Sequence, residues 1–131
     1  MRRNHVFAVH CPTSNCNLGS GIAPIRRFMN AGIPVALGSD VSAGSGFSIF
    51  RAIHYTLQMA KMKWVHSNHR DMFLSLSEAF YLATNSGGSF FGKVGSFEPG
   101  YAFDALVVDD SPLNFDNYTL QHRLERYIYL G

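Results

Sequence analysis

Two short apolar runs of the sequence each finish on a residue that can bind a metal or move a proton. The run "VFAVH" ends on His10, and "PVALGSD" ends on Asp40, thirty positions further along. Small and polar residues come after both runs. In parallel α/β folds the chemistry gathers at the carboxyl ends of strands, where the loops converge on one open face. The spacing therefore predicts that His10 and Asp40 are neighbours on one rim of a parallel sheet.

Each of these two residues also has a purely structural interpretation. Asp40 is flanked by small residues that leave room for a metal ion or a substrate, but an Asp in such a loop can equally bond its own backbone in an Asx turn. A single His at the end of a strand is more often a satisfied structural group than a catalytic one.

The triplet from Gly19 to Gly21 could hold a phosphate on its backbone N–H groups, although such triplets are common in ordinary loops.

The elements that position His10 and Asp40 are predicted from periodicity. Val6 to Val9 and Val35 to Leu37 are short apolar runs typical of buried parallel strands. Between them, residues 11–21 have the composition of an irregular loop, and a helix is expected with an apolar face at Ile22, Ile25, Phe28 and Met29. A β-loop-α-β unit of this length makes a right-handed crossover between neighbouring parallel strands.

The second half of the chain predicts two helices, a strand and a final helix. A long helix begins after Ser48, and another begins at the "SLSE" of residues 75–78, with Glu78 as part of its start, and breaks at Gly87 and Gly88. Ala105 to Val108 are expected to form a strand closed by Asp109 and Asp110. The apolar spacing after residue 117 favours a terminal helix.

Composition narrows the class of protein. A chain of 131 residues with 47% hydrophobic residues predicts a single globular domain. The 11 basic and 9 acidic residues are scattered, so we expect no nucleic-acid partner. No apolar run approaches the ~18 residues of a membrane span, so we expect no membrane partner and a cytoplasmic location. Cys11 and Cys16 match neither a disulfide framework nor a C-x-x-C site, which favours reduced, structural thiols.

The sequence itself resembles a known family. The stretch "HCPTSNCNLGSGIAPIRRFMNAGIPVALGSDVSAG" is similar to the last barrel portion of the guanine deaminases of the amidohydrolase superfamily, and "GSFEPGYAFDALVVDD" resembles that superfamily's return to its small β-sandwich. The resemblance implies an α/β fold: about the last two βα units of a (β/α)₈ TIM barrel over residues 1–94, then the start of the return to the sandwich and a terminal helix over residues 95–131.

The resemblance also implies a reaction and a role for Asp40. Asp40 would end the eighth barrel strand, bind the one Zn²⁺ of the complete active site and handle a proton of the attacking water. Guanine would lose ammonia and become xanthine. His10 would end the seventh strand, with no assured ligand role. The implied partner is therefore a small-molecule purine, and the parent enzyme is a possible homo-oligomer.

The ligand set departs from the family pattern. A zinc site needs about three or four protein ligands, and the family's His-x-His pair has no counterpart after Met1. His5 and His10 point to opposite faces of a strand at period two, and the four remaining histidines, His54, His66, His69 and His122, lack convergent spacing. We therefore expect a carboxyl-terminal fragment of a guanine deaminase that is inactive alone.

Three alternatives stay open at this point. The parent enzyme could act on another amino-purine, a pterin or a triazine. The chain could instead be a non-catalytic truncated product, or a subunit that needs an amino-terminal partner. A third class is a small phosphate-binding module that uses residues 19–21.

Overall fold

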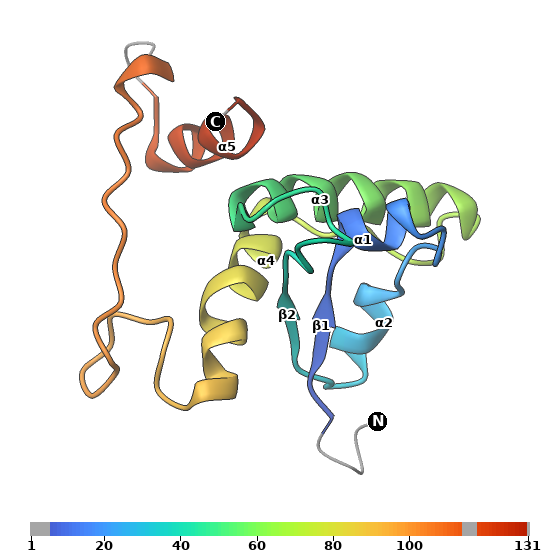
Figure 1. Cartoon of the computed structure of the whole chain (residues 1–131), viewed down its shortest axis with the longest axis horizontal. Helices are drawn as coiled ribbons and strands as arrows, with labels where there is room; N and C mark the ends of the chain where they lie inside the picture. The colour runs from blue at the N-terminus through green and yellow to red at the C-terminus, as the bar shows by residue number, and fades with distance from the viewer. Residues whose placement is uncertain (1–5, 114–117, 131) are drawn as a thin grey trace.

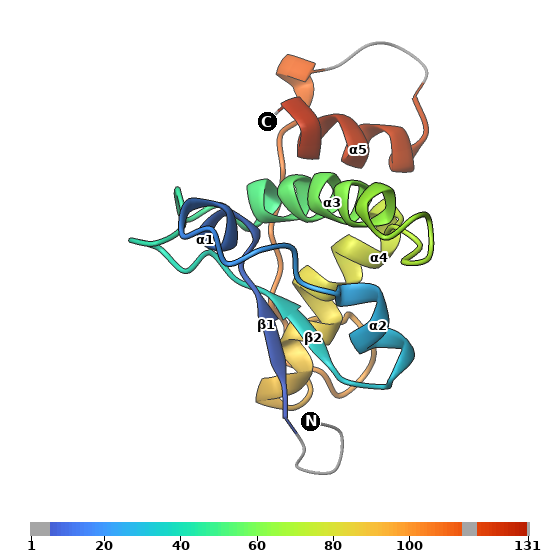
Figure 2. The same cartoon turned by 90° about the vertical axis from the view of Figure 1, so that its right-hand side faces the viewer.

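The computed structural model describes residues 6–113 and 118–130, and its centre is a pair of parallel strands. Strand β1 (Ala8–His10) lies beside β2 (Val35–Leu37), with Ala8 opposite Val35 and His10 opposite Leu37. The β-α-β crossover predicted from the sequence is therefore confirmed. All three residues of β2 are buried, whereas β1 is buried only at His10. Figures 1 and 2 show both strands running toward the same end of the molecule.

The connection between the strands holds two short helices, α1 (Pro12–Asn17) and α2 (Ile25–Asn30). The expectation of an irregular loop over residues 11–21 was wrong over its first half, because Pro12 occupies the first turn of α1, where its fixed φ is favourable and its missing N–H costs nothing. The one helix predicted in this connection is confirmed from Ile25 on, but Ile22 of its predicted apolar face lies before the start, and Pro24 is the N-cap. Gly32 lies just beyond it with φ 66°, a backbone conformation that favours glycine.

Helix α3 (Ile49–His66) is the longest element and begins where the sequence predicts. The Ser48 hydroxyl caps it by accepting a hydrogen bond from the Arg51 N–H at 3.2 Å. The helix lies across the carboxyl ends of both strands in Figures 1 and 2. Its buried apolar residues Ile53 and Leu57 share one core with Val35 and Leu37 of β2.

A continuous helical stretch comes next, made of α4 (Leu76–Tyr81), the π-helix η2 (Leu82–Ser86) and the 3₁₀ turn η3 (Ser89–Phe91). Ser75 and Glu78 form a capping box at its start, which confirms the helix start predicted at residues 75–78. The expected break at Gly87 and Gly88 was wrong, because both keep helical dihedrals and the stretch ends at Gly92. Gly88 is required there for another reason: a Cβ would lie 2.2 Å from the Val94 carbonyl oxygen.

Beyond η3 the chain leaves the core. Residues 102–110 are extended without regular secondary structure, so the strand expected over Ala105 to Val108 is absent. No partner strand adjoins this segment among the described residues, and a β-strand needs one for its ladder of hydrogen bonds. The chain then turns at η4 (Ser111–Leu113) and returns in the predicted terminal helix α5 (Leu120–Leu130), which packs against α3.

Candidate functional site

Asp40 lies three residues beyond β2, in a tight loop at the carboxyl end of the sheet. Its backbone has φ 45°, in the left-handed region that Asp tolerates better than most residues. The Ser14 hydroxyl of α1 donates a hydrogen bond of 2.5 Å to Asp40 Oδ2. Ser14 is buried and Asp40 is exposed. The Asp40 carboxylate is therefore held by a buried hydroxyl group and accessible to solvent.

Two further side chains of α1 fasten the same loop. Asn17 Nδ2 donates to the Ala43 carbonyl at 2.7 Å, and Thr13 Oγ1 accepts from the Ser45 N–H at 3.4 Å. With Ser14, these residues make α1 the support of the Asp40 loop. Sequence reasoning missed all three, because the composition of this stretch is typical of a loop. The signal that would have found them is Pro12 with short polar residues after it, which is the pattern of a helix start.

Gly44 closes the loop through a very close backbone approach. Its N–H donates to the Asp40 carbonyl at 2.6 Å. A Cβ at this position would lie 2.0 Å from the Ser39 carbonyl oxygen and 2.9 Å from Thr13 Oγ1. Real Cβ atoms do not approach backbone so closely, so the loop that presents Asp40 requires glycine at position 44.

The electrostatics of the loop are those of an exposed carboxylate beside a half-buried thiol. Burial raises the pKa of Cys11, and the negative charge of Asp40 raises it further. Cys11 is therefore a neutral thiol at neutral pH, and both cysteines are free, as predicted. Oδ1 of Asp40 accepts no hydrogen bond from the described residues, which leaves it open to one ligand.

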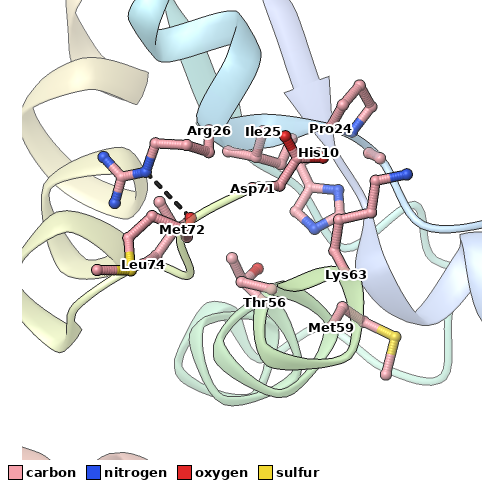
Figure 3. A pocket seen from close by; sticks show the side chains of 12 residues that line it. His10, Pro24, Ile25, Arg26, Thr56, Met59, Lys63, Asp71, Met72 and Leu74 are labelled. Atoms are coloured by element: carbon pink, nitrogen blue, oxygen red, sulfur yellow. Dashed lines mark hydrogen bonds between the residues drawn. The ribbon is translucent and has the colours of Figure 1, made fainter. Parts of the chain in front are cut away.

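His10 is in a different environment from Asp40, although their strands adjoin. The backbone register puts His10 opposite Leu37, so the two strands adjoin as predicted, but Asp40 lies three residues further along the chain. The His10 side chain, however, is only 4% exposed and lines a small cavity with Thr56 and Asp71 (Figure 3). Burial lowers the pKa of His10 to about 4, so the ring is neutral at pH 7.

The other candidate groups do not assemble into a site. The Gly19 and Ser20 N–H groups donate to the carbonyls of Cys16 and Asn15, so they close α1 and are engaged already. Asp110 forms a two-pronged ion pair with Arg123 at 2.6 and 2.7 Å. Within residues 6–113 and 118–130, no three His, Cys, Asp or Glu side chains are placed to hold a metal ion together. His5 lies outside the described residues.

A parallel β-α-β unit with a carboxylate at the carboxyl end of its second strand is consistent with a piece of a barrel hydrolase. The family model "Amidohydrolase family" matches residues 1–127, and the chain belongs to this family. A solved guanine deaminase from C. acetobutylicum, with guanine bound in its active site, is 62% identical, superposes with a TM-score of 0.95 and covers 99% of this chain. The match confirms the predicted fold, a partial amidohydrolase barrel.

Curated relatives agree with this similarity. The chain is 37% identical over 131 residues to the guanine deaminase of Dictyostelium discoideum, covering 93% of this chain. It is 43% identical over 104 residues to a probable guanine deaminase of Schizosaccharomyces pombe, covering 76%. The chain spans 29% and 20% of the lengths of these two relatives and 31% of the C. acetobutylicum protein.

The described part of the chain contains no candidate for a membrane-spanning helix. None of its helices combines the length and the apolar character needed to cross a bilayer.

Proposed function

We propose that this chain supplies part of the active site of a guanine deaminase, which converts guanine and water to xanthine and ammonia. The observation that carries the proposal is the similarity to the C. acetobutylicum guanine deaminase, 62% identical over 99% of this chain. That protein has guanine bound in its active site. The predicted hydrolase class follows from the family, and the choice of guanine rests on these relatives.

Asp40 is proposed as both a metal ligand and the acid/base group. Its exposed carboxylate has one oxygen held by Ser14, and the other accepts no hydrogen bond from the described residues, which suits one bond to a metal ion. Zinc bound there would supply a water whose pKa is lowered to roughly 7. The Asp40 carboxylate would accept the proton of that water and pass it to the departing amine.

The remaining zinc ligands are proposed to come from the part of the enzyme that corresponds to the rest of the relatives' length. One carboxylate leaves an ion mostly hydrated, since zinc sites use three or four protein ligands. We therefore expect the 131-residue chain alone to hold no stoichiometric zinc and to produce no xanthine.

The domain division is also a proposal. Residues 1–94 would form the last two βα units of the barrel, and residues 95–131 the return to the β-sandwich with the terminal helix. The extended segment supports this division, because Phe103, Leu106 and Val107 are at least 80% exposed, as expected for a strand whose neighbours lie elsewhere. The free thiols of Cys11 and Cys16 support a reducing, cytoplasmic location. A homo-oligomer of the parent enzyme is proposed on the family resemblance alone.

The test is co-expression with the amino-terminal portion of a guanine deaminase relative. We expect co-elution on size-exclusion chromatography, about one zinc per complex and xanthine formation, with none of these for either part alone. Asp40→Asn in the same complex is the matched control and should co-elute without turnover. A folded, zinc-loaded complex that deaminates another amino-purine, a pterin or a triazine but not guanine would contradict the substrate assignment.

A further inference from the structure

Helix α5 carries apolar or aromatic side chains on two of its faces. Leu124 and Ile128 pack against the core, and Ile128 is 3% exposed. Arg126 is two residues away from each of them, about half a helical turn, so it lies on the opposite side of the helix. Figures 1 and 2 show α5 on the side of α3 that is remote from the strands. The face of α5 around Arg126, which we call the outer face, is therefore directed away from the core.

The outer face has a hollow of about 390 Å³. Six residues of the segment 118–130 line it: Tyr118, His122, Glu125, Arg126, Tyr129 and Leu130. Tyr118 lies over the helix, since its ring centroid is 5.8 Å from that of His122 and 5.1 Å from Arg126 Cζ. Tyr118 is 43% exposed and Leu130 is 62% exposed, so apolar surface of this hollow is in contact with solvent.

The middle of the outer face carries two opposite charges. Glu125 is exposed and forms no ion pair or hydrogen bond with residues 6–113 and 118–130. Arg126 follows directly, and the five N–H donors of a guanidinium let it bind a further acceptor besides the partners it has already. His122 comes three residues before Glu125, and Tyr129 comes three residues after Arg126. The outer face therefore has rings at equal distances from its centre and opposite charges at the centre, which makes it complementary to an antiparallel copy of itself.

The shape of the hollow favours a protein partner over a small molecule. Small-molecule sites bury about 70–90% of the ligand, whereas a hollow lined by one helix and the residues just before it covers a ligand from one side only. A second copy of the chain supplies the opposite wall from the same residues when the two copies are related by a two-fold axis. If that axis passes between positions 125 and 126, Glu125 of each copy lies opposite Arg126 of the other, and His122 lies opposite Tyr129.

We propose that the outer face of α5 is a contact between two copies of this chain, in which the two α5 helices pack antiparallel and Glu125 of each copy forms an ion pair with Arg126 of the other. The contact covers the exposed apolar surface of the hollow. It contains two ion pairs, because the two-fold axis repeats each contact. The proposal rests on no step of the deamination, and it assigns a surface to the homo-oligomer proposed above.

Sedimentation equilibrium of the co-expressed complex and of the 131-residue chain alone tests the proposal. We expect reversible association into pairs of complexes and into pairs of chains. The absence of pairs in both samples would overturn the proposal. Pairs of the chain alone that disappear in the complex would overturn it as well, because the amino-terminal portion would then cover the outer face. If the two parts fail to assemble, the proposed function fails, and the chain alone still tests the contact between α5 helices.

Charge reversal distinguishes this contact from other modes of association. In Glu125→Arg, Arg126 of the second copy meets a like charge, and in Arg126→Glu, Glu125 of the second copy does. We expect each single variant to raise the Kd of association at least about tenfold, as for the loss of a close charge pair across an interface. The double variant Glu125→Arg/Arg126→Glu restores opposite charges, so we expect it to associate more tightly than either single variant.

Glu98→Arg is the matched control, because it makes the same change of charge at an exposed residue of the turn before the extended segment. We expect Glu98→Arg to leave the Kd unchanged, and far-UV circular dichroism to show that all variants keep their helices. Equal Kd values for Glu125→Arg and Glu98→Arg, or a double variant that associates no better than the single ones, would contradict the contact. If Arg126→Glu does not fold, the comparison of Glu125→Arg with Glu98→Arg still decides, since Glu125 is exposed.

Discussion

The two adjoining strand ends differ in almost every physical respect. At the end of β1, His10 is buried and lines a small cavity. At the end of β2, Asp40 is exposed, has a left-handed backbone and belongs to a loop held by side chains of α1. Two residues one βα repeat apart therefore lie in different environments. His10 lies in the packed interior, and the Asp40 carboxylate is exposed to solvent.

The difference arises from the segment that comes directly after each strand. After His10 the chain enters α1 at once, so His10 stays within the packed interior. After Leu37 the chain makes a loop of small residues before α3 begins at Ile49. Helix α3 then covers the His10 side and leaves the Asp40 carboxylate exposed. Position at a strand's carboxyl end is thus necessary for a role on the rim but does not establish one.

The largest effect is expected from removing the charge at the exposed end. Asp40→Asn in the assembled enzyme keeps the shape and the tolerance for φ 45°, but would remove the proposed anionic ligand and proton acceptor. We expect kcat to fall by at least about 10²–10⁴-fold, as for loss of an acid/base group. The measurement is a xanthine assay together with a thermal melt, and near-normal turnover in a folded variant would contradict the assignment.

The second largest loss of turnover is expected from a change in the loop that carries Asp40. Gly44→Ala forces a Cβ against the Ser39 carbonyl, so we expect a loss of about 1–3 kcal/mol of stability and a large loss of turnover. Gly19→Ala is the control, because Gly19 has φ 64° but open space around its Cβ position. Denaturant unfolding and the xanthine assay should show a larger loss of stability and of turnover in Gly44→Ala than in Gly19→Ala. Equal losses in the two variants would contradict the importance of the close backbone approach at Gly44.

A smaller effect is expected from the residue that orients Asp40. Ser14→Ala removes the hydrogen bond to Oδ2, and we expect a kcat lower by about 10- to 100-fold, which corresponds to the ~1.5–3 kcal/mol of a hydrogen bond to a charged group. Thr13→Ala is the control, because Thr13 contacts the loop at 3.4 Å and forms no bond to Asp40. Equal turnover in the two variants would contradict the proposal that Ser14 orients Asp40.

The smallest effect is a pH dependence of stability that comes from the ion pair between Arg26 of α2 and Glu78 of α4. Hydrogen bonds from Arg26 lower the pKa of Glu78 from 4.5 to about 2, with further help from Ser75. The ionised Glu78 thus stabilises the fold above pH 4.5, and this contribution is lost as the pH falls toward 2. Because the pair is partly exposed, we expect about 1 kcal/mol at most. Glu78→Gln should reduce the loss of stability across this range in acid unfolding, and an unchanged slope would contradict it.

Periodicity and helix caps were enough to predict part of this structure. The crossover between β1 and β2, the Ser48 cap of α3, the helix start at residues 75–78 and the terminal helix are local patterns, and all were predicted. The role of Asp40 stays a prediction, because the residues that would complete a metal site are not among those described.

The failures of prediction have physical reasons. The segment Ala105 to Val108 has the composition of a strand, but composition does not supply a neighbouring strand. Gly87 and Gly88 predict a helix break from their type alone, yet they continue the helix where Val94 packs against Gly88. The cavity beside His10 joins residues up to 64 positions apart in sequence, from His10 to Leu74, so no local pattern contains it.

The extended segment over residues 102–108 has a consequence for the integrity of the chain. A protease needs an extended, accessible backbone, and this segment has both properties. A cut there would break the covalent chain but leave α5 attached to α3, since Phe50 stacks edge-on against Tyr127 at 4.8 Å and His54 lies 4.7 Å from Tyr129. Helix α5 would then be held by non-covalent contacts alone. The fraction of α5 that dissociates would therefore increase as the cleaved protein is diluted.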